Sequence, residues 1–402
     1  MKSKAYKVIG TRPLRHDGVD KVTGRALFGA DIHLPGLLHG RVLRSPYAHA
    51  SIKSIDTSRA ASNPRVKSIA TSKDFASVEP VSQEATPGVT PSENVLARGK
   101  VFYKGHPVAA VAANSDHFAD IALSMIDVEY DPLPWVSNVE DSMNVGAPIL
   151  HEHWRTTTSG KPTNVAGYEK HVMGDIDIGF AQADLIVERE FRTKTVHQGY
   201  IEPQSATALW APNGRLTIWC SSQGHFGIRD NTARILGIPV SDIKVIPMEI
   251  GGGFGGKLPV YLEPIAAILS RGSGRPVKMK MDRSDVLEST GPTCGSYVRV
   301  KIGVTSDGRI TAAHSFFAFE AGAFPGAPLT GASAAVFAPY NIQNVTIEGY
   351  DVVDNKPKTS AYRAPGAPIV AFAVESVMDE ISEELGVDPM DLRVLNVAEC
   401  GT

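Results

Sequence analysis

The residues best suited to do chemistry gather in residues 251–257, the glycine loop, which read Gly-Gly-Gly-Phe-Gly-Gly-Lys. They follow an apolar, strand-like run over residues 243–250. Glycine adopts positive φ and lets the backbone approach a ligand closely. A row of exposed amides in such a turn can bind an anion. The glycine loop therefore predicts a ligand-binding backbone, with a plain tight turn as the alternative.

Two further turns carry polar side chains that could reach the same ligand. Gln223 is the last of residues 221–223, here called the Gln223 turn, which follow a strand-like run over residues 215–220. Arg363 lies in residues 361–366, the Arg363 turn, which read Ala-Tyr-Arg-Ala-Pro-Gly. Taken singly, a glutamine after a strand is usually a satisfied structural amide, and an arginine in a loop usually pairs with a carboxylate. Neither residue alone predicts a function.

The elements around these turns follow a repeated order of strand, turn and helix. The Gln223 turn leads to a helix predicted over about residues 226–236, which Gly237 ends. The glycine loop leads to a helix that contains residues 264–270. Because ligands tend to bind at strand ends along one edge of such a domain, we expect the two turns to lie close together.

The chain as a whole predicts an α+β fold with more than one domain, since 402 residues are too many for one ordinary core. Residues 17–133 alternate short strands with turns, and they include one helical pattern over residues 118–125. Residues 134–170 read as an irregular linker, loosest at residues 156–160. Residues 171–402 form the predicted second domain.

The end of the second domain carries clear hairpin and helix signals. A hairpin is expected between residues 297–304 and 310–317. A helix is expected over about residues 369–385, where apolar residues share one face before Gly386. Asp388 and Pro389 should begin one more helix, as its N-cap and first residue.

Composition argues against several classes of protein. A formal net charge of -3 gives no reason to expect nucleic acid or an anionic membrane as partner. Cys220, Cys294 and Cys400 are far apart, which excludes a disulfide framework and leaves too few thiolates for an iron–sulfur cluster of the chain's own. A reducing, cytoplasmic compartment is therefore expected. No secretory signal is visible, and no run approaches the roughly 18 apolar residues of a membrane span.

His151 and His153 form the one histidine pair whose spacing could ligate a metal. No third ligand lies near them in the sequence. We therefore expect them in a solvated loop.

Together, the three turns resemble the molybdopterin-binding large subunit of the xanthine dehydrogenase and aldehyde oxidoreductase family. The resemblance runs from about Asp17 to the end of the sequence, and its most specific motifs are the glycine loop and the Arg363 turn. Gln223, Glu202-Pro203 and residues 17–26 support it. It implies a hammerhead-like α/β domain followed by the first molybdopterin-binding α+β domain, without the second cofactor-binding domain.

The resemblance also implies how this chain would hold a molybdenum cofactor. The implied cofactor-binding residues are Gln223, Gly252, Gly253, Phe254, Gly255, Gly256 and Arg363. The Gln223 amide and the backbone at Phe254 and Arg363 would contact the ligands of the molybdenum, so that no protein side chain binds the metal directly. The cofactor is a molybdopterin, expected in a dinucleotide form.

The implied reaction is hydroxylation with oxygen from water, in which a glutamate acts as base. The family's glutamate lies in a Gly-x-Gly-Glu motif of the second cofactor-binding domain, and that motif is absent from this sequence. We therefore expect no catalytic residue in this chain. A second molybdopterin-binding polypeptide would carry the base, as in the split large subunits of nicotinate dehydrogenase, unless the chain is a fragment. An iron–sulfur small subunit and an FAD subunit would accept the electrons.

Three residues bear on the implied substrate pocket: Glu202, Leu258 and Pro365. Leu258 stands where xanthine-specific members carry a glutamate, and Pro365 stands where an aromatic ring packs on the substrate. Ala364 replaces the cysteine of carbon monoxide dehydrogenases. The substrate implied is therefore either an aldehyde or an N-heteroaromatic acid. Glu202 is expected as a pocket or structural residue rather than as the base.

Two other functions remain as alternatives. A nucleotide-binding enzyme could use the glycine loop as a phosphate cradle, but a P-loop needs Ser or Thr after Gly-Lys, and Leu258 stands there. A non-catalytic scaffold subunit would explain the missing glutamate. It would have no need for Gln223, Phe254 and Arg363 together.

Overall fold

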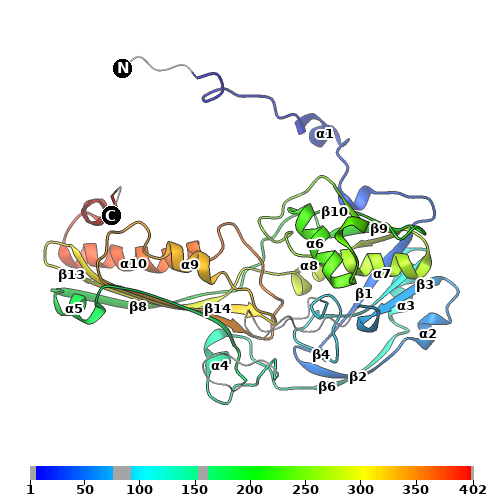
Figure 1. Ribbon diagram of the computed structural model, residues 1–402, viewed down its shortest axis with the longest axis horizontal. Helices are drawn as coiled ribbons and strands as arrows, with labels where there is room; N and C mark the ends of the chain where they lie inside the picture. Colours follow the sequence, from blue (N-terminus) through cyan, green and yellow to red (C-terminus); the bar gives the residue numbers. More distant parts are fainter. Residues whose placement is uncertain (1–5, 76–91, 153–161, 400–402) are drawn as a thin grey trace.

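The computed structural model describes residues 6–75, 92–152 and 162–399, which form two large sheets and one small one (Figure 1). The largest sheet has seven strands in the order β11-β10-β9-β12-β1-β5-β3. Its strands are β1 (Leu38–Arg44), β3 (Val66–Thr71), β5 (Pro107–Ala113), β9 (Ser205–Trp210), β10 (Leu216–Cys220), β11 (Ile243–Pro247) and β12 (Val277–Lys280).

This sheet joins strands from both halves of the chain. β1 pairs in parallel with β12, so that Leu38 lies opposite Val277. One hydrogen-bonded sheet therefore contains strands from before and after residues 134–170, the segment that the sequence predicts as a linker between two domains. The division into those domains stays a prediction.

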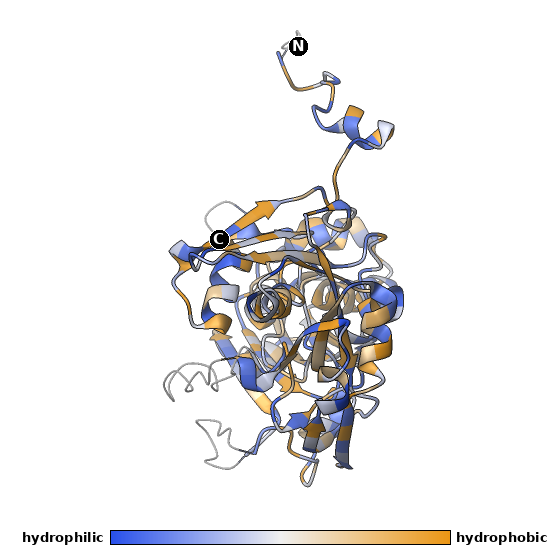
Figure 2. Ribbon diagram, turned by 90° about the vertical axis from the view of Figure 1, so that its right-hand side faces the viewer, coloured by the Kyte–Doolittle hydropathy of each residue, from blue (hydrophilic) through white to orange (hydrophobic). Residues whose placement is uncertain are grey.

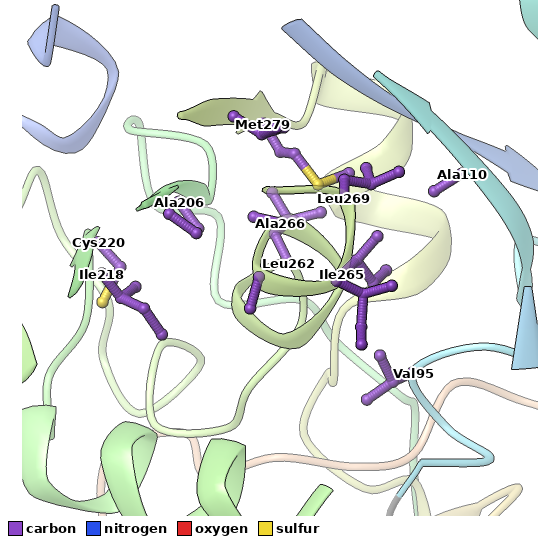
Figure 3. Close-up of a cluster of buried hydrophobic side chains, with 14 of the residues drawn as sticks. Val95, Ala110, Ala206, Ile218, Cys220, Leu262, Ile265, Ala266, Leu269 and Met279 are labelled. Carbon is purple, nitrogen blue, oxygen red and sulfur yellow. The ribbon is translucent and has the colours of Figure 1, made fainter. Parts of the chain in front are cut away.

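The core of the seven-stranded sheet is centred on helix α7 (Glu263–Ser273), which is buried along its first eight residues. Leu269 lies beside Met279, and Ala266 faces Ala206. Ile265 lies toward Val95 (Figure 3). Alanines line much of β5, including Ala110, so the helix can approach the sheet closely. α6 (His225–Leu236) and α8 (Arg283–Ser289) lie in the same part of the molecule (Figure 1).

The second sheet has five strands in the order β7-β15-β14-β13-β8. Its strands are β7 (Val165–Met173), β8 (Leu185–Thr193), β13 (Ser296–Val304), β14 (Ile310–Gly322) and β15 (Val345–Val353). Helices α9 (Leu329–Ala335) and α10 (Ala367–Leu385) cover one face, where α10 buries its apolar stripe. The shorter α4 (Val139–Met143) and α5 (Ile176–Ala181) lie on the other side (Figure 1).

The third sheet is small and has the order β4-β2-β6. The elements that remain are β2 (Ala50–Asp56), β4 (Lys100–Val101), β6 (Asp127–Pro132), α1 (Gly18–Thr23), α2 (Ser58–Ala61), α3 (Asp116–Leu123), α11 (Pro389–Asn396) and the 3-10 turns Gly29–Asp31, Ser72–Asp74 and Val240–Asp242. The segment that carries α1 extends away from the body in both views (Figures 1 and 2), and α1 buries none of its residues. In the described ranges, no helix combines the length and the apolar character that crossing a membrane requires.

The helices predicted from capping signals are confirmed. α6 and α10 both end at a glycine in the left-handed region, Gly237 with φ 65° and Gly386 with φ 65°. The Asp388 side chain accepts hydrogen bonds from Met390 N and Asp391 N, and thereby caps α11. The expected hairpin corresponds to β13 and β14, and the α+β fold class is confirmed.

Two expectations about residues 134–170 need correction. The segment is not irregular throughout, because it contains α4 and the start of β7, and β7 pairs with β15 over its length. Residues 156–160 lie outside the described residues. His151 is not in a solvated loop, since it is 2% exposed and its Nε2 lies 2.7 Å from the carbonyl oxygen of Ala323. His153 lies outside the described residues, and within them no three His, Cys, Asp or Glu side chains are grouped as metal ligands.

The position of Leu269 at the centre of this core gives the first prediction. Leu269 is fully buried, so Leu269→Ala should lower the free energy of unfolding by about 2–5 kcal/mol through lost burial and the cavity left behind. Leu287→Ala is the matched control, because Leu287 is 52% exposed. Urea unfolding of both variants measures the difference. Equal effects would contradict the position of the core.

Candidate functional site

The Gln223 turn and the glycine loop lie side by side because they follow neighbouring parallel strands. β10 and β11 pair in parallel, with Leu216 opposite Ile243, so their carboxyl ends meet at one edge of the sheet. Gly255 N donates to Gln223 Oε1 at 2.8 Å, and Lys257 N donates to the same oxygen at 3.2 Å. The predicted proximity of the two turns is confirmed.

These two hydrogen bonds fix the orientation of the Gln223 amide. Both donors are backbone N–H groups, which cannot accept a hydrogen bond, so the side-chain oxygen must face them. The Nε2 group therefore points away from the two amides. Over the described residues it has no hydrogen-bond partner, which leaves a donor that a ligand could use.

The Arg363 turn contacts the glycine loop through its backbone. Arg363 N donates to the carbonyl oxygen of Phe254 at 2.9 Å. Three residues earlier, Ser360 Oγ donates to the carbonyl oxygen of Gly255 at 3.1 Å. The three turns, which are far apart in the sequence, thus form one continuous site.

The backbone of the site is unusual at three residues that are not glycine. Phe254, Arg363 and Ala364 have φ values of 51°, 29° and 62°, and the described residues contain no other case outside glycine. Such conformations cost on the order of 1–3 kcal/mol each and cluster at functional sites. All three residues lie where the glycine loop meets the Arg363 turn. A phenylalanine or an arginine gives no sign of this conformation in the sequence.

The glycine loop presents consecutive amides without partners. Across the described part of the chain, the N–H groups of Gly252, Gly253 and Phe254 make no hydrogen bond. Backbone amides are strong donors that normally find an acceptor. An anion or a polar ring system at this position would supply those acceptors.

Large side chains beside these amides are open to solvent. Phe254 is 48% exposed, Leu258 is 44% exposed and Tyr362 is 38% exposed. Arg363 and Pro365 are exposed as well. The site is therefore open on this side.

Lys257 points in the opposite direction, into the protein. Its side chain is 0% exposed, and its Nζ lies 2.7 Å from Glu202 Oε2 and 2.8 Å from Ser221 Oγ. Burial lowers the pKa of the Lys257 ammonium, while the Glu202 carboxylate opposes that shift. A P-loop lysine must reach phosphate. Because Lys257 is committed to Glu202, the structure argues against the P-loop alternative.

The structure brings together most of the predicted site residues. Those that meet around the three turns are Gln223, Gly252, Gly253, Phe254, Gly255, Gly256 and Arg363. Leu258 and Pro365 lie exposed beside them, and Glu202 lies beneath the glycine loop with its carboxylate turned to Lys257. The roles of these residues toward a cofactor or a substrate stay predictions.

Sequence reasoning missed Gln198, whose side chain holds two loops together. Gln198 Nε2 donates to the carbonyl oxygens of Gly291 at 3.0 Å and Ala361 at 2.9 Å. Its partner Ala361 is 163 positions away in the sequence. No local pattern signals such a contact.

Comparison with known proteins finds two family models that match this chain. A family model described as molybdopterin cofactor-binding domain matches residues 157–397. A second model, the a/b hammerhead domain of aldehyde oxidase and xanthine dehydrogenase, matches residues 23–134. Together these models cover most of the described chain.

Curated relatives point to the same family. The chain is 30% identical over 407 residues to the nicotinate dehydrogenase large molybdopterin subunit of Eubacterium barkeri, covering 99% of this chain and 91% of that protein. It is 31% identical over 387 residues to a probable xanthine dehydrogenase subunit of Bacillus subtilis, covering 96% of this chain and 50% of that protein.

Solved structures share the fold. The chain superposes on quinoline 2-oxidoreductase from Pseudomonas putida 86 with a TM-score of 0.87 at 28% identity, covering 97% of this chain and 50% of that one. It superposes on the Cu,Mo-CO dehydrogenase with a TM-score of 0.86 at 28% identity, covering 97% of this chain and 51% of that one. Because the match extends over the three turns and the whole fold, the chain belongs to the aldehyde oxidase and xanthine dehydrogenase family and is a molybdopterin-binding subunit of it.

Proposed function

We propose that this chain is the molybdopterin-binding subunit of a molybdenum hydroxylase that oxidises an aldehyde or an N-heteroaromatic substrate with oxygen from water. The observation that carries the proposal is the convergence of the Gln223 amide, the partner-free amides of the glycine loop and the Arg363 turn. The molybdenum cofactor, when bound, supplies the two-electron redox chemistry. Every other contribution described below comes from the chain itself.

The residues present fit such a cofactor. A Cβ atom on Gly253 would lie 2.5 Å from Gln223 Oε1, and one on Gly255 would clash with the carbonyl oxygen of Ala361. Only glycine therefore lets the glycine loop lie this close to Gln223 and to the Arg363 turn. The amides of Gly252, Gly253 and Phe254 would donate to polar ring or phosphate oxygens, and Gln223 Nε2 would donate to an oxygen bound to the metal.

We assign the proton-accepting residue to a second molybdopterin-binding polypeptide. The Gly-x-Gly-Glu motif expected for the base is absent from this sequence, and Glu202 Oε2 already accepts hydrogen bonds from within the protein. The coverage of 91% of the nicotinate dehydrogenase large subunit supports a split arrangement. An iron–sulfur small subunit and an FAD subunit would carry the electrons away, and the cofactor would be the dinucleotide form.

Two further proposals concern substrate and location. Leu258 and Pro365 lie exposed beside the partner-free amides and would contact the substrate. Neither offers a hydrogen-bonding side chain or an aromatic ring, which supports an aldehyde or an N-heteroaromatic acid over a purine. A cytoplasmic location stays a prediction from the cysteine usage.

The proposal is tested by metal analysis of the complex purified with its partner subunits. Wild-type complex should contain molybdenum and a pterin. Gln223→Ala should lower turnover by about 10- to 100-fold, because residues around a metal centre commonly contribute that much. Gln182→Ala, at an exposed position, should leave turnover unchanged. Turnover that survives Gln223→Ala would favour the scaffold alternative, and a complex without molybdenum would refute the proposal.

The close contact between Gly255 and Ala361 gives a separate prediction. Gly255→Ala places a methyl group against the Ala361 carbonyl at a residue with φ 105°, so the complex should lose most of its molybdenum. Gly214→Ala is the matched control, because Gly214 also has positive φ (85°) but has nothing within 4 Å of the added Cβ. Elemental analysis measures both. A normal metal content in Gly255→Ala would contradict the proposed close approach.

A further inference from the structure

A single carboxylate oxygen joins the two ends of the glycine loop. Glu202 Oε2 accepts from the backbone N–H of Gly251 at 2.7 Å and from the Lys257 ammonium at 2.7 Å. Gly251 is the first residue of the loop and Lys257 is the last. The Ser221 hydroxyl donates to the same oxygen at 2.6 Å, which ties in the start of the Gln223 turn.

Lys257 also connects this oxygen to Gln223. Lys257 N donates to Gln223 Oε1 at 3.2 Å, and Gln223 N donates to the carbonyl oxygen of Lys257 at 3.0 Å. Ser222 Oγ donates to that carbonyl at 3.1 Å. The residue whose side chain binds Glu202 therefore also contributes through its backbone, together with Gly255 N, to the direction in which the Gln223 amide points.

Stability alone does not account for an ion pair at this position. Both charges are largely removed from water, since the side chains of Lys257 and Glu202 are 0% and 13% exposed. A buried ion pair can often be replaced by apolar residues of similar size without loss of stability. Apolar residues could not bind Gly251 N, Ser221 Oγ and Lys257 at one point. What the pair provides beyond stability is a fixed geometry.

Catalysis by the Glu202 carboxylate does not fit its contacts either. Oε2 already receives three hydrogen bonds, and Oε1 is buried without a partner among the described residues. A base needs an oxygen within reach of the proton that it accepts. The Glu202 carboxylate is turned toward Ser221 and Lys257 inside the protein, whereas the side chains of Phe254 and Leu258 are exposed.

We propose that Glu202 and Lys257 are positioning residues, which fix the span of the glycine loop and the direction of the Gln223 amide so that both can hold the molybdenum cofactor. The inference rests on the proposed function. Its distinctive consequence is that breaking the pair should disturb the metal centre even when the stability of the fold is restored.

The experiment compares Glu202→Gln with the double variant Glu202→Gln/Lys257→Met in the complex assembled with its partner subunits. Glu202→Gln leaves the buried Lys257 without an anion, so it should lower both the melting temperature and the molybdenum content. The double variant removes both charges and should recover much of the melting temperature. It should not recover the metal centre, because the loop ends and Gln223 are no longer joined at one oxygen.

Two readouts distinguish positioning from stability: molybdenum per complex and the electron paramagnetic resonance signal of the partly reduced enzyme. We expect molybdenum retention to fall by about 10-fold or more in both variants. The signal of the metal that remains should change as it does in Gln223→Ala.

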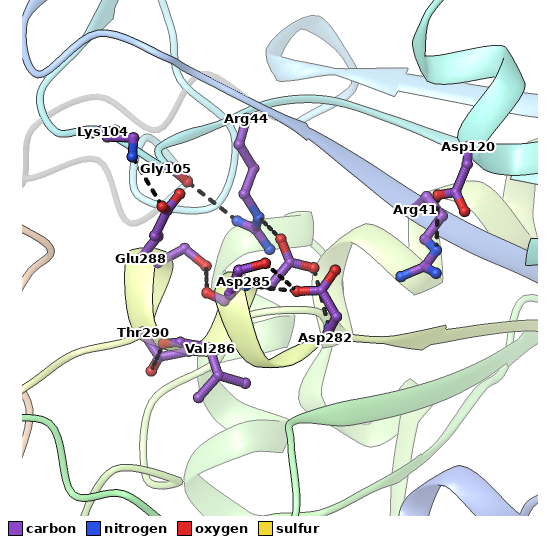
Figure 4. Close-up of polar contacts among 12 residues, drawn as sticks. Arg41, Arg44, Lys104, Gly105, Asp120, Asp282, Asp285, Val286, Glu288 and Thr290 are labelled. Atoms are coloured by element: carbon purple, nitrogen blue, oxygen red, sulfur yellow. Dashed lines mark hydrogen bonds and ion pairs between the residues drawn. The ribbon is translucent and has the colours of Figure 1, made fainter.

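The control is an ion pair in the same sheet and helix layer but outside the three turns. Arg44 Nε lies 2.5 Å from Asp285 Oδ1, with side chains 10% and 23% exposed (Figure 4). Asp285→Asn should lower the melting temperature without changing the molybdenum content or the resonance signal.

The outcomes separate the two proposals. If the double variant regains both the metal content and the wild-type signal, or if Glu202→Gln behaves like Asp285→Asn, the pair is only structural and the inference is overturned. If wild-type complex holds no molybdenum, the proposed function fails and the inference fails with it. A normal melting temperature with an altered metal centre in the double variant supports it.

Discussion

The parallel pairing of β10 with β11 is the constraint on which the site depends. It brings the carboxyl ends of two strands to one edge, so that the Gln223 turn and the glycine loop, which follow these strands, meet there. Backbone amides of the loop then bind the Gln223 side chain directly. The Arg363 turn then completes the third side through the hydrogen bond of Arg363 N to Phe254, together with those of Ser360 and Gln198.

The site combines backbone strain with hydrogen bonds that join its three turns. Phe254, Arg363 and Ala364 adopt backbone conformations that free chains avoid. Such conformations persist only where surrounding contacts determine them, and here Gly255 is in contact with both Gln223 and Ser360. The buried pair of Glu202 and Lys257 holds the loop from beneath.

The sequence predicted this site as far as local signals reach. The order of strand, turn and helix placed Gln223 beside the glycine loop, and capping residues such as Gly237 and Asp388 located helix ends, because these effects act over a few residues. It did not reveal the pairing of β1 with β12 or the contact of Gln198 with Ala361, which join distant segments. The family resemblance, rather than periodicity, brought Arg363 to the other two turns.

Solvent exposure determines how strongly the hydrogen-bond donors of the site can bind a ligand. The side chains of Phe254, Leu258 and Tyr362 are exposed, so water can reach this part of the site. Water then weakens the hydrogen bonds that Gln223 Nε2 and the loop amides could donate to a ligand. The same fixed donors become far stronger once water is excluded, because they need no reorganisation to meet developing charge. A second surface that covers the exposed side chains would therefore do more than supply the proposed base. It would lower the local dielectric around donors that this chain already holds in place.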